Sequence, residues 1–497
     1  MLLLPDGGVT QADSRNQGVI KVAEGFLELL RAAVAAEPGR VFARTAEAEL
    51  TLAALDAESD ALAAGLRARG VARGDRVAAV LPNTLESLTL VFAMAKAGIA
   101  WVPLNPQLSE TGLQHILSLT RPRLVLREGE EAGLRAPGGF HEARPTAADD
   151  FAICTTSGTT GPPKGVRVSH RMLRLAGEGV ALVADARDGD VMFMWEPLHH
   201  IGGVQMVVLP LLRRAVLHLV PRFSASRFWA DVIAARATHL HYLGGILQIL
   251  LKQDPSPAER AHALRIAWGG GCPAELWPQV QARFGVALRE CYGMTEASSF
   301  SSFNADGTPG SVGRAMPWFE VSVVDAAGQT LPPGVRGEIV VRARERLALT
   351  QGYLDNPEAT ARALRDGALH TGDSGSLDAA GNLFFHGRMT DSVRVRGENV
   401  AAWEVESIAA QHPDVADCAM IGVAAEIGEQ EIKLFLQPRA GATLDLAAFD
   451  AWLAPRLARY QRPRYLALVQ EFPRTPSQRI QKFALPAGLR DGLDTRA

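Results

Sequence analysis

The segment from residue 76 to residue 106 alternates apolar runs and polar breaks in the order of a strand, a helix and a second strand. A short apolar run at residues 77–80 leads into Pro82-Asn83-Thr84, where Asn83 or Thr84 can cap a helix. Apolar side chains then recur at the spacing of one buried helix face, at Leu85, Leu88, Val91, Phe92 and Ala95. Gly98 ends this predicted helix, and residues 99–104 are typical of the next strand.

The same alternation of strand and helix recurs along the first part of the chain, around residues 115–126, 164–186, 228–243 and 263–292. This order predicts layered parallel sheets with helices on both faces. From about residue 312, short apolar runs separated by Gly and Pro turns predict a meander or a small β-barrel.

After Arg388 the pattern changes again. It predicts helices at residues 403–411 and 446–459 and strands at residues 418–423, 431–437 and 465–469. We therefore predict an α/β protein with a large N-terminal domain of residues 1–390 and a small α+β C-terminal domain of residues 391–497, with the boundary near Asp391.

Length and composition narrow the class of protein. A chain of 497 residues predicts two or more domains. Its 47% hydrophobic and 21% charged residues are typical of a soluble globular protein, and a net charge of -3 gives no reason to expect nucleic acid as a partner. The start MLLLPDGG lacks the basic region of a signal peptide, and the apolar run at 201–212 is too short for a membrane span, so we expect a cytoplasmic protein.

The stretch TTSGTTGPPKG at residues 155–165 carries the candidate chemistry. It follows a predicted strand, and its hydroxyls and unhindered backbone N–H groups can surround an anion (Thr155, Thr156, Ser157, Gly158, Thr159, Thr160 and Gly161). Lys164 adds a point charge, so a polyphosphate is the expected ligand. The stretch is not a Walker A loop, because Lys164 precedes a strand and not a helix. Pro162-Pro163 and the flanking apolar strands disfavour a flexible linker.

This loop resembles the phosphate loop of the adenylate-forming, AMP-binding superfamily, which includes the acyl-CoA synthetases. The resemblance covers almost the whole chain in order, through GDRVAAVLPN, KAGIAWVPLNP, the loop itself, EPLHHIGG, GGGCP, CYGMTEAS, TGDSGSLDAAGNLFFHGRMTD and RGENVAAWEVE. The last of these is closest to the CoA ligases for carnitine and crotonobetaine. Because fold-level resemblance alone does not fix a function, each motif is assigned its own chemistry.

The motif CYGMTEAS is expected to bind ATP and Mg2+. Tyr292 offers a face for stacking adenine, Gly293 lets the backbone approach closely, Thr295 can hydrogen-bond a phosphate oxygen, and Glu296 is a hard oxygen ligand for Mg2+.

Three further motifs are expected to complete the nucleotide site and the hinge. Residues Gly270, Gly271 and Cys272 lie in a turn that permits contact with the adenine edge. Asp373 can accept hydrogen bonds from both ribose hydroxyls. By resemblance, Arg388 contacts the ribose or a phosphate and Asp391 is the hinge of a mobile C-terminal domain; from the bare sequence, Arg388 would be a surface charge.

The acid substrate is expected beside EPLHHIGG. By resemblance, His200 adjoins the substrate carboxylate, while His199 is the more variable of the two. Residues 241–250, Trp268 and residues 298–302 are expected to form the rest of the pocket. These segments are mostly apolar and offer no evident partner for a second carboxylate or an α-amino group, which favours a small organic acid that is uncharged apart from its carboxylate.

The resemblance implies attack of a carboxylate oxygen on the α-phosphorus of ATP, giving an acyl adenylate and pyrophosphate, with catalysis by positioning and charge neutralisation. The family's catalytic lysine lies in a segment resembling P-K-T-x-x-G-K-I-x-K, which reads PRTPSQRIQK here. Arg479 stands at the lysine position and Gln478 at the preceding glycine, so Arg479 is the expected catalytic cation and Lys482 the fallback.

The second half-reaction implied by the resemblance is thioester formation with CoA, whose thiol arm Gly397 would admit. Two alternatives stay open. The adenylate can pass to a carrier protein, an amine or a nitrogen centre, or the enzyme can activate an oxyanion other than a carboxylate. The departure at Gln478-Arg479 also leaves open a non-catalytic nucleotide-binding homologue.

Overall fold

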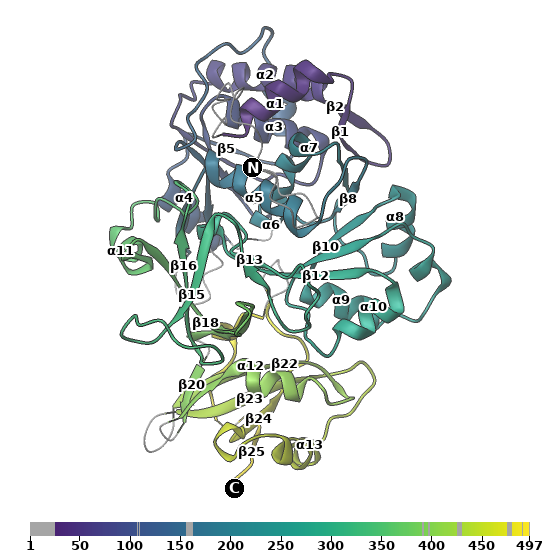
Figure 1. Ribbon diagram of the computed structural model, residues 1–497, viewed down its shortest axis with the longest axis vertical. Coiled ribbons are helices and arrows are strands. Elements are labelled where there is room, and N and C mark those ends of the chain that lie inside the picture. The colour runs from purple at the N-terminus through teal and green to yellow at the C-terminus, as the bar shows by residue number, and fades with distance from the viewer. Residues whose placement is uncertain are drawn as a thin grey trace, which may run out of the picture.

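The computed structural model describes residues 25–106, 108, 110–155, 163–389, 392–395, 398–424, 430–474, 480–489 and 491–496. A large N-terminal part holds two mixed sheets and one antiparallel sheet, and the C-terminal sheets lie together at one end of the molecule (Figure 1).

The first sheet has five strands in the order β5-β3-β4-β6-β7 and is parallel except for the β6–β7 pair. Its strands are β3 (Arg76–Ala79), β4 (Ala100–Pro103), β5 (Leu124–Leu126), β6 (Asp150–Thr155) and β7 (Gly165–Ser169). The helices in this part of the chain are α1 (Leu27–Ala36), α2 (Leu52–Ala68), α3 (Leu85–Lys96), α4 (Glu110–Thr120) and α5 (His170–Val183). Helix α3 begins as its sequence predicts, because the Thr84 hydroxyl accepts a hydrogen bond from the Ser87 N–H.

The second sheet has nine strands in the order β14-β13-β12-β11-β10-β8-β9-β1-β2, and its central strands are parallel. Its strands are β1 (Val41–Arg44), β2 (Glu49–Thr51), β8 (Val191–Met194), β9 (Val216–Leu219), β10 (His239–Leu243), β11 (Ile266–Gly270), β12 (Ala287–Tyr292), β13 (Ser302–Phe303) and β14 (Arg314–Ala315). The helices α8 (Phe228–Ala235), α9 (Gly244–Leu251) and α10 (Trp277–Phe284) lie beside it (Figure 1). This arrangement confirms the predicted α/β class.

The region predicted as a meander or small barrel is a five-stranded antiparallel sheet. It contains β15 (Phe319–Val324), β16 (Gly337–Ala343), β17 (Leu364–Arg365), β18 (Ala368–Leu377) and β19 (Leu383–Arg388), with α11 (Pro357–Ala363) before β17. In this sheet Asp373 is the register partner of Arg388, so strand pairing alone brings these two residues together.

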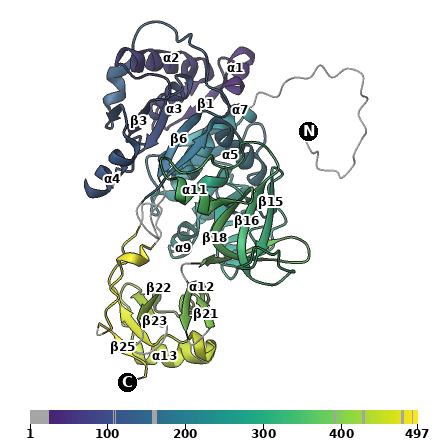
Figure 2. The same cartoon turned by 90° about the vertical axis from the view of Figure 1, so that its left-hand side faces the viewer.

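The C-terminal part has its own apolar core, drawn from residues between Val393 and Leu493. It consists of β20 (Ser392–Val395), β21 (Glu398–Ala401), α12 (Ala402–Ala409), β22 (Val415–Ala424), β23 (Gln430–Pro438), α13 (Leu446–Leu453), β24 (Tyr465–Leu468) and β25 (Leu493–Asp494). Its contacts with the large part include an ion pair between Arg336 and Glu404 and a hydrogen bond of 3.2 Å from the Lys252 ammonium to the Ala416 carbonyl. The segment beyond β24 runs alongside the C-terminal sheet toward the large part (Figure 2).

One predicted segment differs from expectation in detail. The helix predicted at residues 446–459 ends at Leu453 and continues as a 3-10 turn, because Pro455 has no N–H with which to extend it. The apolar run at 201–212 is divided into α6 (Ile201–Val204), a 3-10 turn (Gln205–Val208) and α7 (Leu209–Leu212). Within the described ranges, no helix is both long and apolar enough to span a membrane.

Candidate active site

Lys164 and Glu296 are brought to one place through Tyr353. The start of β7 runs beside residues 350–354: the Leu354 N–H donates to the Gly165 carbonyl at 2.8 Å, and Val166 pairs with Tyr353. The Lys164 ammonium consequently lies 5.1 Å from the centroid of the Tyr353 ring, within range of a cation–π contact. The Tyr353 hydroxyl donates to Glu296 Oε1 at 2.9 Å. The cation and the carboxylate assigned to the phosphates thus share one tyrosine.

Glu296 is a buried carboxylate. It follows Thr295 in a short 3-10 turn (Thr295–Ala297) directly after β12, and only 6% of its surface is exposed. Burial, together with the Glu296 charge, raises the pKa of the Cys154 thiol on β6 to about 12. Residues 156–162 lie outside the described ranges, so the predicted roles of Thr156, Ser157, Gly158, Thr159, Thr160 and Gly161 remain predictions.

The residues around Glu296 can be compared with the ligands that Mg2+, the metal implied for this site, usually binds. Mg2+ is usually held by one or two carboxylates together with substrate phosphates. Glu296 supplies one buried carboxylate, and Tyr353 engages one of its two oxygens in the contacts described above. Among the described residues no group of three or more His, Cys, Asp or Glu side chains could hold a metal on its own. The set therefore fits a cation that arrives with ATP, and does not fit one held by protein groups alone.

A second group of polar residues joins β12, β18 and β19. The Tyr292 hydroxyl donates to Asp373 Oδ2 at 2.7 Å, and Arg388 Nε lies 3.2 Å from Asp373 Oδ1. Asp373 is 4% exposed, whereas the Arg388 side chain is 38% exposed and reaches solvent. The Phe385 ring lies 5.6 Å from the Tyr292 ring. The structure thus brings together the three residues assigned to adenine and ribose.

The turn after β11 is held by a buried carboxyl group, Glu290. Its side chain accepts hydrogen bonds from the backbone N–H groups of Gly271 and Cys272 and from the Tyr242 hydroxyl. Burial raises the pKa of Glu290 to about 7, although these three donors oppose the shift. The N–H groups of the predicted adenine turn are therefore tied to β10 and β12 through one side chain.

Three glycines of the motifs are favoured for different reasons: close backbone approach at Gly293 and Gly270, and a positive φ at Gly271. A Cβ atom at Gly293 would lie 1.8 Å from the Ser299 carbonyl oxygen, so no other residue fits there without a shift of the backbone. Gly271 has a φ of 91°, in the region that favours glycine. Gly270 ends β11, where an added Cβ would meet the Cys291 carbonyl at 3.2 Å.

The predicted acid pocket contains charged groups that its sequence did not reveal. His200 precedes α6, and its ring lies 5.8 Å from the ring of His199, whose pKa falls to about 4 through burial. Deeper in the same region, the Glu196 carboxylate contacts the His241 imidazole, and both side chains are buried. The fully buried Trp268 ring lies 4.1 Å from the His241 ring. The pocket wall is therefore not purely apolar.

The C-terminal candidates are only partly described. Arg479 and Gly397 lie outside the described ranges, as does the proposed hinge Asp391. Lys482 is described: its ammonium lies 2.8 Å from Glu406 Oε1 on α12, within the C-terminal part. In this arrangement Lys482 serves the packing of that part, and its assignment to the nucleotide stays a prediction.

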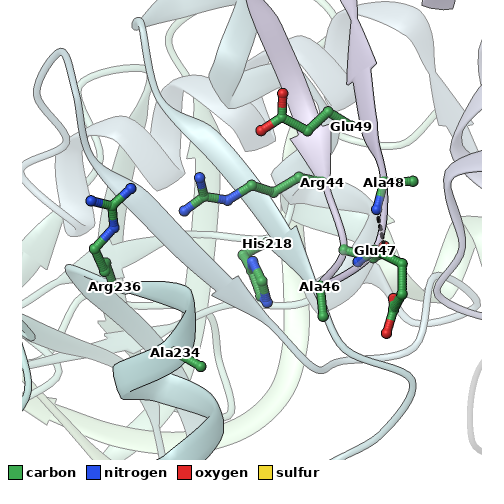
Figure 3. Close-up of a pocket in the computed structure, with 9 residues that line it drawn as sticks. Arg44, Ala46, Glu47, Ala48, Glu49, His218, Ala234 and Arg236 are labelled. Atoms are coloured by element: carbon green, nitrogen blue, oxygen red, sulfur yellow. Dashed lines mark hydrogen bonds between the residues drawn. The ribbon is translucent and has the colours of Figure 1, made fainter.

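A further recess lies apart from the predicted site. It measures about 320 Å³ and lies between the β1–β2 hairpin and the end of α8, with the side chains of Arg44, His218 and Arg236 around it (Figure 3). Glu47 and Glu49 also line it, so its charges are mixed. None of the predicted site residues borders this recess.

Three residues of the site were missed from the sequence: Tyr353, Glu290 and Glu196. A tyrosine in the loop GYLDNPEAT and a glutamate inside an apolar strand carry no distinguishing local pattern. Glu196, directly before the proline of EPLHHIGG, offered the one usable signal, an acidic residue in an otherwise apolar approach to the motif.

Comparison with known proteins gives the same assignment. The model of the AMP-binding enzyme family matches residues 30–354, and that of the AMP-binding enzyme C-terminal domain matches residues 404–479. The crotonobetaine/carnitine–CoA ligase of Citrobacter koseri is 30% identical over 477 residues, which cover 87% of this chain and 92% of the relative. That of Escherichia coli O8 is 31% identical over 455 residues, 83% of this chain and 88% of the relative.

Solved structures are similar over the same length. ATP-bound MatB from Rhodopseudomonas palustris superposes with a TM-score of 0.85 at 28% identity, covering 93% of this chain and 98% of that one. The O-succinylbenzoate coenzyme A synthetase of Bacillus subtilis, in complex with ATP and a magnesium ion, superposes with a TM-score of 0.81 at 25% identity, covering 92% and 98%. The chain therefore belongs to the AMP-binding enzyme family and is an adenylate-forming ligase of the acyl-CoA synthetase type.

Proposed function

We propose that this enzyme joins a small organic acid, uncharged apart from its carboxylate, to the α-phosphate of ATP and then transfers the acyl group to free CoA. The observation that carries the proposal is the linkage of Lys164 and Glu296 through Tyr353, because it sets one cation and one carboxylate beside the loop assigned to the phosphates. The names of the curated relatives support CoA as the acceptor.

In the first step a carboxylate oxygen attacks the α-phosphorus, the bond to the bridging oxygen breaks, and pyrophosphate leaves with that electron pair. Two anions must meet, so the protein contributes mainly position and charge. Lys164 is assigned to the β- and γ-phosphates, and Asp373 with Arg388 to the ribose. Mg2+ bound beside Glu296, with Thr155 and Thr295 nearby, would add positive charge at the phosphates.

Tyr353 has a positioning role in this scheme. Its pKa is raised by burial and by the Glu296 charge, so its hydroxyl keeps its proton and acts as a donor to that carboxylate. The hydrogen bond fixes one carboxylate oxygen and leaves the other to face a cation. The ring, at the same time, limits where the Lys164 ammonium can lie.

The C-terminal part is proposed to supply the remaining cation. We assign Arg479 to the carboxylate and α-phosphate during adenylation and Gly397 to the CoA tunnel during transfer. A hinge near Asp391 would exchange the two arrangements. A separate apolar core for residues beyond Val393 supports such a rotation.

The experiment is a pyrophosphate-release screen over a panel of carboxylic acids, each run with CoA, with amine acceptors and with neither. The proposal predicts acid-dependent release and an acyl-CoA product. Acid-dependent release without acyl-CoA would point to another acceptor, and release independent of every acid to a different oxyanion. Binding of ATP without any release would favour a non-catalytic homologue.

A further inference from the structure

The buried side chains of Glu196 and His241 are in contact in the wall of the predicted acid pocket. Glu196 follows the end of β8, His241 lies within β10, and the carboxylate Oε2 contacts the imidazole Nδ1. The two residues are only 5% and 8% exposed. Burying a carboxylate is costly unless it is paired and hydrogen-bonded, so this pair needs an explanation beyond packing.

The surroundings of the pair are mainly aromatic and apolar. Phe193, Trp195, Met206 and Gly202 surround Glu196 and His241 closely and leave no space for a water molecule between them. Trp268 packs against the His241 ring and is itself fully buried, yet its indole N–H has no hydrogen-bond partner among the described residues. An unpaired donor beside a buried carboxylate marks a place where a polar ligand group can gain contacts that the protein does not supply.

Backbone geometry directs the carboxylate toward the His200 segment. A Cβ atom at Gly202 would lie 2.6 Å from Glu196 Oε2, so glycine at this position leaves the carboxylate its room. Gly202 is the second residue of α6, immediately after His200 and Ile201. The Gly202 carbonyl accepts from the Gln205 amide at 2.9 Å, and Gln205 in turn accepts from the Ser299 hydroxyl. The pair therefore adjoins both segments assigned to the acid.

Glu196 and His241 also lie close to the residues assigned to the adenine of ATP. His241 is the register partner of Trp268 on β11, one residue before the glycines of the adenine turn. The Glu196 charge is among the causes that raise the pKa of the buried Cys291 thiol on β12. An acid held beside His200, with its carboxylate toward ATP, would thus extend its other end toward Glu196 and His241.

The negative charge of Glu196 determines which substituent the acid can carry at the end opposite its reacting carboxylate. A carboxylate offers about four acceptor positions, and the polar contact described for Glu196 uses Oε2 alone. A second carboxylate on the substrate would meet the negative charge of Glu196 at close range. A purely apolar substituent would leave the Glu196 oxygens and the Trp268 N–H without partners. A neutral hydrogen-bond donor avoids both costs.

We propose that Glu196, held by His241, is a specificity-determining residue that accepts a hydrogen bond from a hydroxyl or amino substituent of the acid substrate. This inference rests on the proposed function, because it concerns the same pocket. The expected substrate is thereby narrowed from any small organic acid to one with a hydroxyl or amino substituent. Dicarboxylic acids are excluded.

The test compares acids that differ only in one substituent: hydroxyl, amino, methyl or carboxyl at the same position of an aromatic acid. Acid-dependent pyrophosphate release gives kcat/KM for each. The parent enzyme is expected to prefer the hydroxyl or amino acid over the methyl acid by about tenfold or more, since a site built to bind a donor rejects the analogue without it. Glu196→Leu is expected to reverse this order, and Glu196→Gln to reduce it. Exposed Glu275, replaced by Gln, is the matched control and should keep the parental order.

Binding provides a second readout that does not depend on turnover. Calorimetry of the same acids with a non-hydrolysable ATP analogue should show the same order for the parent enzyme and its loss in Glu196→Leu. A parental preference for the methyl or carboxyl acid, or an equal loss for every acid in the Glu196 variants, would overturn the inference. Absence of pyrophosphate release with every acid would instead contradict the proposed function, and the calorimetric order would still decide the role of Glu196.

Discussion

The hydroxyl group of Tyr353 donates a hydrogen bond of 2.9 Å to the buried carboxylate of Glu296. The two residues are 57 positions apart in the chain and meet because residues 350–354 run alongside β7. Through the same tyrosine ring the carboxylate is coupled to Lys164. The phosphate end of the site is therefore a three-residue unit, in which loss of the middle member should affect both charged partners.

Tyr353→Phe tests this unit. The ring and its contact with Lys164 are kept, while the hydrogen bond to Glu296 is lost. Because hydrogen bonds to charged groups contribute about 1.5–3 kcal/mol, we expect kcat/KM for ATP to fall about 10- to 100-fold. Steady-state kinetics with ATP as the varied substrate measures the effect. Tyr460→Phe, at a 39% exposed site, is the control and should match the parent; equal activity of both variants would remove Tyr353 from the unit.

Asp373→Asn tests the ribose assignment. The substitution keeps the size of the side chain but takes the negative charge from the Tyr292 and Arg388 contacts. We expect KM for ATP to rise about tenfold or more, with a smaller change in kcat, because the contact is made in both the ground state and the transition state. Asp306→Asn alters an exposed carboxylate of the same domain and should leave KM unchanged. If the acid KM rises and the ATP KM does not, Asp373 belongs to the acid site.

Glu290 predicts a pH dependence of stability. Its pKa is raised from 4.5 to about 7 by burial, so the folded protein binds the proton more tightly than the unfolded chain. Its contribution is complete below pH 4.5 and is lost as the pH rises through 7. The full loss is roughly 3 kcal/mol for a shift of this size.

Glu290→Gln imitates the protonated side chain and should remove this dependence. Thermal unfolding of parent and variant from pH 4.5 to pH 8 measures it: the variant is expected to gain stability relative to the parent as the pH rises. The difference in stability between variant and parent should become constant above pH 8. Parallel curves across the whole range would show that Glu290 is ionised in the folded enzyme throughout.

Arg479 and Lys482 can be separated by single substitutions. Arg479→Ala is expected to lose acid-dependent pyrophosphate release, and Arg479→Lys to retain it, because the step requires a cation at this position. Lys482→Ala should keep adenylation, since its ammonium is paired with Glu406 in the C-terminal part. Pre-steady-state measurement of pyrophosphate release isolates this step. The reverse order of losses would transfer the catalytic role to Lys482.

The sequence predicted what local patterns encode. The Thr84 cap and the apolar face of α3 are local signals, and both appear in the structure as expected. Helix α13 was predicted too long because its apolar spacing continues past Pro455, where the missing N–H ends the regular helix. The order of the motifs along the chain was likewise sufficient to predict the family that the comparisons confirm.

Contacts between distant residues could not be predicted in this way. The Glu290–Tyr242 and Glu296–Tyr353 hydrogen bonds join residues 48 and 57 positions apart. The pocket segments appear apolar in the sequence because Glu196, after the end of β8, and His241, within β10, are far apart in the chain and neither indicates its partner. The sequence therefore did not indicate which polar side chains are buried next to one another.

Attack of a carboxylate oxygen on the α-phosphorus of ATP can be followed with an isotope. An acid labelled with 18O in both carboxylate oxygens is incubated with the enzyme, ATP and Mg2+ and then with CoA, and the nucleotide is analysed by mass spectrometry. Each AMP formed should carry one 18O atom, and the pyrophosphate should carry none. Unlabelled AMP, or 18O in the pyrophosphate or in inorganic phosphate, would show that the carboxylate oxygen does not attack the α-phosphorus.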